Sequence, residues 1–339
     1  MSTELQATIA RLVQPGKGIL AADESGPTIT KRFDALGIES TEETRRAYRS
    51  LLATTPGIEE YVAGIILFEE TLEQKADDGT PIVDLLSRRG ILPGIKVDKG
   101  TVPLPGAPGD LVTQGLDGLA DRLKAYKAKG ARFAKWREVY GITDHNPTPL
   151  GIEANAEVLA RYAAICQEQN VVPIVEPEVL IDGDHTLERC EVVTDAVLHA
   201  VFHAIHRHRV MLEFMVLKPN MVITGKARLP KASHEEVARA TLGVLRRNVP
   251  AAVPTINFLS GGQSSVDATA HLNAMNAMAS SAPWILSFSY ARALQDDAMR
   301  TWAGRAENVR AAQDAFYRRA KMNSLARHGK WSMALEKAA

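Results

Sequence analysis

Short apolar segments rich in Val, Ile, Leu and Phe recur along the chain, and each is bounded by Gly, Pro or polar residues. Eight of them span residues 18–23, 64–68, 91–97, 131–136, 171–177, 210–219, 255–260 and 284–290. Between them, apolar positions recur at the spacing of amphipathic helices, as in residues 118–129, 154–169, 194–208, 235–248 and 266–280. The pattern therefore predicts strands that alternate with helices.

Nearly continuous apolar strands that alternate with helices are typical of a parallel sheet covered by helices. Eight such units in one chain of 339 residues predict an α/β protein with a closed (β/α)8 barrel, a TIM barrel. We expect a single domain over residues 1–339, with a helical C-terminal tail that begins at about residue 300.

Polar residues stand at or just beyond the C-terminal ends of the apolar segments. In a TIM barrel these ends converge on one mouth, where the active site lies. A single polar residue there is explained as a solvated strand end, but charged residues at six strand ends predict an active site. The polar residues are Asp23, Lys96, Lys135, Arg137, Glu176, Glu178, Lys218, Ser260, Ser289 and Arg292.

Lys218 directly follows the apolar residues 214–217. Loss of hydration at such a position disfavours an ammonium and favours a neutral, nucleophilic amine. Lys135 comes from another strand end and adds like-charge repulsion in the same direction, which is a recognised route to a lysine that forms a Schiff base. A lysine held in a salt bridge with Glu176 or Glu178 explains the two residues equally well, so both interpretations stay open.

Glu176 and Glu178 are two residues apart, so both side chains point to the same face if the strand continues through them. A carboxylate near cations stays ionised, whereas one in a drier place can transfer protons. Imine formation needs such an acid and base to expel water. Without the lysines, the same segment would be interpreted as an exposed acidic turn.

Residues 259–264, Leu-Ser-Gly-Gly-Gln-Ser, follow the seventh apolar segment and precede a predicted helix. Backbone amides of such a turn at a helix N-terminus form an anion site, although a flexible glycine turn also explains the Gly-Gly pair. Ser289 and Arg292, after the eighth segment, supply a hydroxyl and a guanidinium for phosphate. A second anion is expected at a group of cations from other parts of the chain, namely Lys96, Arg137 and Arg32.

Charge and composition narrow the range of partners. The chain has 40 Lys and Arg against 40 Asp and Glu, interspersed, so we expect no nucleic acid partner. The chain lacks an apolar run near the roughly 20 residues of a membrane span, and its start lacks the apolar stretch of a signal peptide. Cys166 and Cys190 form neither a CxxC motif nor a disulfide framework, which favours a cytoplasmic location.

Two further patterns are weak as cofactor signals. His199 and His203 have the i, i+4 spacing of a helical zinc site, but no Glu completes an HExxH motif. They also precede the sixth apolar segment, toward the barrel end opposite the mouth, so we expect surface histidines and no metal. Gly16 and Gly18 lack the remainder of a dinucleotide fingerprint, and the chain contains no P-loop motif.

Seven longer motifs occur in order along the chain. They are GILAADES at 18–25, IKVDKG at 95–100, FAKWR at 133–137, IVEPE at 174–178, LKPNMV at 217–222, LSGGQS at 259–264 and FSYARAL at 288–294. Together they resemble the class I fructose-1,6-bisphosphate aldolases over about residues 9–322. The resemblance implies a cytoplasmic, homotetrameric carbon–carbon lyase of glycolysis and gluconeogenesis. Such an enzyme reversibly cleaves its sugar bisphosphate through a Schiff base, without metal or other cofactor, to dihydroxyacetone phosphate and glyceraldehyde 3-phosphate.

The resemblance also implies roles for the matching residues. Lys218 is expected to form the imine with the C2 ketone, Glu176 to serve as acid and base in dehydration, and Asp23 to take the C4 hydroxyl proton. Lys135 balances charge beside Asp23, and Glu178 orients the lysines. The expected contacts of the C1 phosphate are Ser260, Gly261, Gly262, Ser289 and Arg292, and those of the C6 phosphate are Lys96, Arg137, Arg32 and Thr28.

The sequence departs from the family pattern at two places. Ala291 stands where the family motif has glycine, and its methyl group is expected to crowd an amide near phosphate. The chain also ends without the terminal tyrosine of animal relatives, to which proton transfer after cleavage is attributed.

Three other functions stay open at this point. They are a Schiff-base aldolase of another ketose phosphate, a catalytically silent scaffold, and a metal-dependent aldolase that uses the histidines. The complete set Asp23, Lys135, Glu176 and Lys218 argues against a silent scaffold. Activity that resists a chelator would exclude the metal-dependent enzyme.

Overall fold

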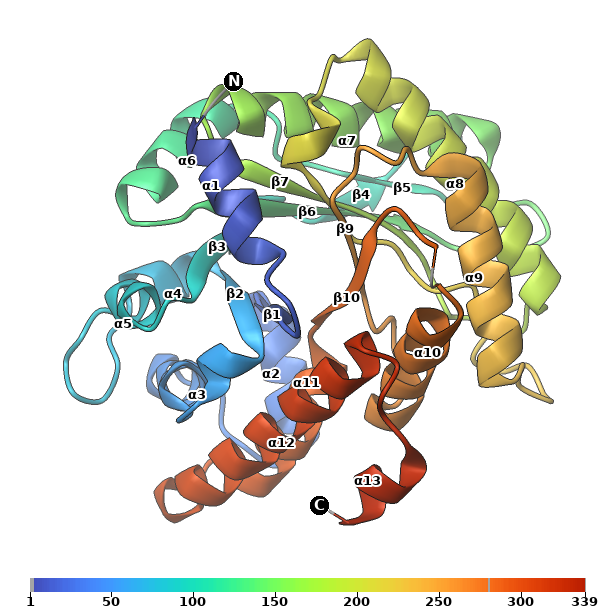
Figure 1. Ribbon diagram of the computed structural model, residues 1–339. Helices are drawn as coiled ribbons and strands as arrows, with labels where there is room; N and C mark the ends of the chain where they lie inside the picture. The colour runs from blue at the N-terminus through green and yellow to red at the C-terminus, as the bar shows by residue number, and fades with distance from the viewer. Residues whose placement is uncertain (1–2, 280, 339) are drawn as a thin grey trace.

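A computed structural model describes residues 3–279 and 281–338. Eight parallel strands close into a barrel in which each strand pairs with the next, and the last pairs with the first (Figure 1). This confirms the predicted TIM barrel. The barrel strands are β1 Gly18–Ala22, β2 Val62–Leu67, β3 Leu92–Lys96, β6 Phe133–Tyr140, β7 Val172–Val179, β8 Val216–Leu217, β9 Thr255–Phe258 and β10 Ile285–Tyr290.

Helices surround the barrel, and α2 to α10 lie between its strands in the sequence (Figure 1). They are α1 Thr3–Leu12, α2 Gly26–Asp34, α3 Glu42–Thr54, α4 Glu69–Glu73, α5 Ile82–Arg88, α6 Leu119–Ala128, α7 Pro149–Glu168, α8 Leu187–Arg207, α9 His234–Asn248, α10 Ser265–Met278, α11 Arg292–Trp302, α12 Val309–Arg327 and α13 Met333–Ala338. The predicted helix end at Ser280 and the tail residue Ala339 lie outside the described residues. Within the described ranges, no helix combines the length and hydropathy of a membrane span.

Two segments differ from the sequence prediction. The sixth apolar segment forms only the two-residue strand β8, because Leu212–Phe214 turn into a short 3-10 helix (η2). An apolar run alone does not distinguish a strand from a buried turn. The structure also contains an antiparallel hairpin of β4 (Thr101–Pro103) and β5 (Leu111–Thr113), which is short and partly exposed and therefore lacks an apolar signal.

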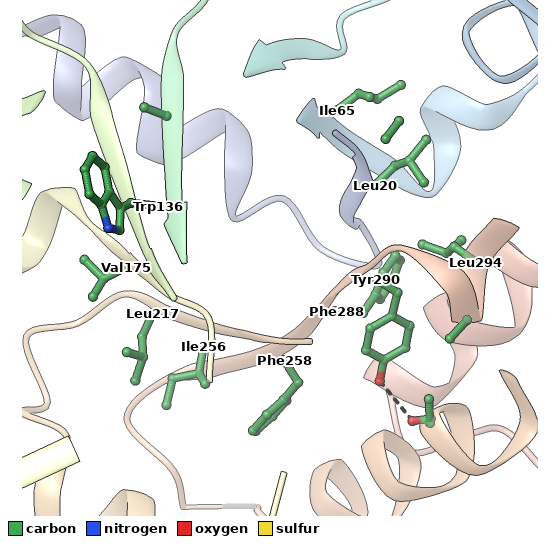
Figure 2. Packing of buried hydrophobic residues seen from close by; sticks show 14 of the residues in the cluster. Leu20, Ile65, Trp136, Val175, Leu217, Ile256, Phe258, Phe288, Tyr290 and Leu294 are labelled. Atoms are coloured by element: carbon green, nitrogen blue, oxygen red, sulfur yellow. Dashed lines mark hydrogen bonds between the residues drawn. The ribbon is translucent and has the colours of Figure 1, made fainter. Parts of the chain in front are cut away.

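The side chains of each strand alternate between two cores. Trp136, Val175 and Leu217 belong to the outer core between strands and helices (Figure 2). Their sequence neighbours Lys135 and Lys218 therefore point into the barrel. This alternation places the charged residues of different strands in one interior layer.

Helix α1 closes the N-terminal end of the barrel. Its residues Leu5, Ile9 and Leu12 pack in one cluster with residues from the beginnings of several strands. These strand residues include Ile19, Leu92, Phe133, Val172 and Val216. The N-terminal part of the interior is thus apolar, and the charged layer lies at the C-terminal end.

Phe133 fills the barrel interior two positions before Lys135, and it is fully buried. Its ring occupies space that is open because the facing strands carry glycine. A Cβ atom at Gly94 would lie 2.2 Å from Phe133 Cε2, and one at Gly64 would lie 2.9 Å from Cε1. The two glycines therefore allow a large aromatic ring to support the charged layer.

We predict that Gly94→Ala lowers the free energy of unfolding by about 2 kcal/mol, because an added methyl group overpacks a filled core. Denaturant unfolding followed by circular dichroism measures the change. Gly141→Ala is the matched control, since a Cβ there meets no atom within 4 Å. This control is expected to change stability by less than about 1 kcal/mol. Equal stability of the two variants would show that Phe133 does not limit the space.

Candidate active site

A cavity of about 340 Å³ opens at the C-terminal ends of the barrel strands. Twelve of the residues predicted for the site line it, and they come from six barrel strands and the segments that follow them. They are Asp23, Thr28, Arg32, Lys135, Arg137, Glu176, Glu178, Lys218, Ser260, Gly261, Ser289 and Arg292.

Two predicted residues do not line this cavity. Gly262 lines a neighbouring cavity of about 280 Å³. Lys96 lies close by, but its ammonium donates a hydrogen bond to Asp98 Oδ1 at 2.6 Å. The role of Lys96 at a phosphate therefore stays a prediction, and a phosphate that binds it must compete with Asp98.

Four buried charged side chains form the centre of the site. Lys135 Nζ lies 2.8 Å from Asp23 Oδ2 and 3.3 Å from Glu176 Oε2. Lys218 Nζ lies 3.0 Å from the other oxygen of Glu176. Each of the four side chains is less than one-tenth exposed. Glu176 therefore joins the two lysines, and Lys135 joins the two carboxylates.

Of the two interpretations that the sequence left open, the salt bridge is present, since Lys218 pairs with Glu176. The salt bridge is compatible with a nucleophilic lysine, because a carboxylate at 3.0 Å can accept the proton that the amine must lose. The expected repulsion between Lys218 and Lys135 is offset, because Glu176 contacts both ammonium groups.

The lysines keep Asp23 ionised. Burial alone would raise the pKa of Asp23, but the positive charges of Lys135, Lys218 and Lys96 lower it to about 2. For Lys135 the balance is reversed: burial would lower its pKa, and Asp23, Glu176 and Asp98 together raise it above its usual range. At neutral pH the site thus presents a carboxylate beside a permanently charged ammonium.

The loop between β9 and α10 has the geometry of an anion site. Gly261 and Gly262 have φ values of 54° and 87°, a backbone region that favours glycine. Ser264 then caps α10 by accepting a hydrogen bond from the amide of Asp267 at 3.0 Å. The positive end of α10 therefore lies next to the loop.

Ser289 and Arg292 complete this end of the cavity. Ser289 Oγ is buried and has no hydrogen-bond partner within the described residues. Arg292 begins α11 and reaches over the glycine loop, with Nη2 at 3.3 Å from the position of a Cβ atom at Gly262. A buried free hydroxyl beside a guanidinium fits a phosphate.

Two other cations that line the cavity are already paired with carboxylates. Arg32 on α2 forms ion pairs with Glu24 and Asp296, and Arg137 on β6 pairs with Glu178. The attraction of Glu178 outweighs burial and raises the pKa of Arg137. An anion that binds here must compete with these carboxylates.

Sequence reasoning missed three charged residues near the site. Glu24 and Lys31 line the cavity, and Asp98 lies 2.6 Å from Lys96 and 3.9 Å from Lys135. Glu24 and Asp98 stand inside two of the motifs that carry the family resemblance, so motif position was a usable signal. Lys31 is three residues after Thr28, the helical spacing that brings side chains to one face.

Ala291 lines the cavity with a φ of −98°, a value that any L-residue adopts. Its ψ of −89° lies outside the main allowed regions, so the negative φ excludes only the left-handed backbone conformation that favours glycine.

The histidines do not gather into a metal site. His199 and His203 lie on α8 and line a separate surface cavity with Glu153 and Arg207. Among the residues that the structure describes, no group of three or more His, Cys, Asp and Glu is arranged to hold a metal ion.

Comparison with known proteins agrees with the fold and with the family resemblance. The family model of fructose-bisphosphate aldolase class-I, a glycolytic family, matches residues 4–339. The chain is 55% identical over 326 residues to cytosolic fructose-bisphosphate aldolase 6 of Arabidopsis thaliana, which covers 96% of the chain and 91% of the relative. It is 54% identical over 329 residues to a probable fructose-bisphosphate aldolase class 1 of Xanthomonas campestris, with 97% and 98% covered.

A solved structure is also similar. It is fructose-bisphosphate aldolase from Plasmodium falciparum in a ternary complex with TRAP and a small-molecule inhibitor. The TM-score is 0.95 at 51% sequence identity, over 97% of this chain and 95% of that chain. With a family model that spans nearly the whole sequence and relatives above half identity, the chain belongs to the class I fructose-bisphosphate aldolases, a family of lyases with the TIM-barrel fold.

Proposed function

We propose that this protein reversibly cleaves fructose 1,6-bisphosphate into dihydroxyacetone phosphate and glyceraldehyde 3-phosphate, with Lys218 as the Schiff-base residue. The observation that supports it is the buried pair of Lys218 and Glu176 at 3.0 Å, with Asp23 and Lys135 on the other side of the same carboxylate. This is the acid, base and amine set that imine chemistry requires.

The first half of the reaction uses Lys218 and Glu176. Glu176 takes a proton from the lysine, and the neutral amine adds to the C2 ketone to give a carbinolamine. Glu176 then returns a proton to the carbinolamine hydroxyl, which leaves as water, and a protonated imine remains.

Carbon–carbon cleavage follows at Asp23. Its carboxylate takes the proton of the C4 hydroxyl, the C3–C4 bond breaks, and glyceraldehyde 3-phosphate leaves with a new aldehyde at C4. The electron pair of the broken bond moves into the protonated imine, which becomes an enamine. Protonation at C3 and addition of water then release dihydroxyacetone phosphate and regenerate Lys218.

The two phosphates occupy opposite ends of the cavity in this proposal. The C1 phosphate is bound by the glycine loop, which is supported by the unpartnered Ser289 hydroxyl and the nearby Arg292 guanidinium. The C6 phosphate is bound by a second group of residues, which come from α2, β3 and β6. The residues proposed for the C1 phosphate are Ser260, Gly261, Gly262, Ser289 and Arg292, and those for the C6 phosphate are Arg32, Thr28, Arg137 and Lys96.

We further propose that the protein acts as a cytoplasmic homotetramer without metal. The family resemblance supports the assembly, and the cytosolic location stated in the name of the Arabidopsis relative supports the compartment. The barrel and the helices that follow residue 300 are proposed to form one domain.

We predict that borohydride traps dihydroxyacetone phosphate covalently on Lys218, because reduction fixes the imine as a stable secondary amine. Peptide mass mapping after trapping locates the adduct, and the yield is expected to be the same in the presence of a chelator. Lys218→Met is expected to abolish the adduct, whereas the half-exposed Lys99→Met serves as the control and keeps it. An adduct on another lysine would contradict the assignment.

We predict that Asp23→Asn lowers kcat for bisphosphate cleavage by about 10²- to 10⁴-fold, because the base for the C4 hydroxyl is lost. Borohydride trapping on Lys218 is expected to persist in this variant, since imine formation uses Glu176. Steady-state kinetics and mass mapping give the two readings. Loss of trapping together with cleavage would show that Asp23 is needed before the carbon–carbon step.

We also predict that the titration of Asp23 does not appear in the pH dependence of cleavage. Its pKa of about 2 means that this carboxylate is already ionised above about pH 4. The kcat/KM profile of the wild-type protein between pH 5 and 9 is therefore expected to contain no step from Asp23. An acidic step that disappears selectively in Asp23→Asn would contradict the low pKa.

A further inference from the structure

A buried charge cluster lies behind Arg32, at the end of the cavity proposed for the C6 phosphate. Its central residue is Glu24, whose side chain is 7% exposed. One carboxylate oxygen accepts from Arg32, and the other accepts from Arg49 Nη2 at 2.9 Å. Glu24 thus links a cavity-lining arginine to an arginine that is not among the cavity-lining residues.

We propose that Arg49 is a positioning residue for the C6 phosphate site, which holds Glu24 in place and offsets its charge so that Arg32 can bind the phosphate. The inference rests on the proposed function, because it takes the assignment of Arg32 to the C6 phosphate as given. Arg49 acts through Glu24, and it does not contact substrate.

The neighbours of Glu24 fix its orientation. Gln295, on α11, donates from Nε2 to Ala21 O at 2.6 Å and to Glu24 Oε1 at 3.1 Å. Gln295 Oε1 accepts a hydrogen bond from Arg32 Nη1 at 3.5 Å. With Arg49 on the second carboxylate oxygen, both oxygens of Glu24 are held, so Arg32 meets a carboxylate of defined position.

The charges of the cluster explain why a second arginine is needed. Arg32 and Arg49 balance Glu24 and Asp296, which is the second carboxylate on Arg32. Without Arg49 the remaining three side chains would carry a net negative charge beside a site for a phosphate dianion. Glu24 would also interact with Arg32 as its only arginine partner, and it would compete more strongly with the phosphate for Arg32.

Arg49 is also costly as a purely structural residue. It is 4% exposed, and its Nη1 has no hydrogen-bond partner in the described part of the chain. Its guanidinium lies 5.9 Å from the centre of the Tyr48 ring. A buried donor without a partner lowers stability, and such departures from good packing concentrate at functional sites.

The test compares fructose 1,6-bisphosphate with fructose 1-phosphate, which has the same C1 phosphate and ketone but no C6 phosphate. In Arg49→Met, KM for the bisphosphate is expected to rise about tenfold, while KM for the monophosphate changes less than about twofold. Arg49→Lys keeps the buried charge with a different reach, so a smaller rise of about threefold is expected for the bisphosphate alone.

The matched control is Arg45→Met. Arg45 lies one helical turn earlier on α3 and pairs with Glu70, and it does not line the cavity. Removal of this charge is expected to leave both KM values unchanged. Thermal melting followed by circular dichroism shows which variants fold. If Arg49→Met does not fold, the KM values of Arg49→Lys are used for the test.

Two results would overturn the inference. One is a KM for the bisphosphate that stays at the wild-type value in every folded Arg49 variant. The other is a parallel rise of KM for both substrates, which would indicate a general structural role. Trapping of dihydroxyacetone phosphate on Lys218 is measured on the same samples. If the wild-type protein lacks that adduct, the proposed function fails. If the adduct forms, a negative result overturns only the role inferred for Arg49.

Discussion

The carboxylate of Glu176 lies between two buried ammonium groups, and the rest of the site depends on that arrangement. An isolated buried charge costs several kcal/mol, so each charged side chain in the barrel interior needs a partner. Lys135 meets this need with Asp23 and Glu176, and Lys218 meets it with Glu176. The four residues are therefore mutually dependent, and removal of one leaves a buried charge without compensation.

The cations that line the cavity differ in how available they are to an anion. Arg292 forms no ion pair within the described residues, and the Ser289 hydroxyl is unpartnered. Arg32 and Arg137 are each paired with carboxylates. Binding at Arg292 and Ser289 adds new hydrogen bonds, whereas binding at Arg32 or Arg137 exchanges one anion for another. Binding at these two arginines is therefore more sensitive to the neighbouring charges.

The barrel and most of the site could be predicted because both follow from local patterns. Alternation along a strand places the neighbours Lys135 and Trp136 on opposite faces of the sheet, and the apolar segments mark where each strand lies. The pairing of cations with carboxylates was harder to predict from the sequence, since Glu24 and Arg49 are 25 residues apart and meet only in the folded chain. The strand predicted before Lys218 was too long, because apolar composition alone does not distinguish a strand from a buried turn.

The location of these residues separates the proposed chemistry from the proposed recognition of the C6 phosphate. Lys135 and Glu176 lie on strands of the closed barrel, and Lys218 directly follows β8, so the proposed reacting centre is supported by the packed interior with Phe133 below it. Of the residues proposed for the C6 phosphate, Thr28 and Arg32 lie on α2, and Arg49 lies on α3; both helices stand between β1 and β2. Changes in these two helices are therefore expected to alter affinity for one phosphate without moving the lysine, which is how barrel enzymes vary specificity on a constant core.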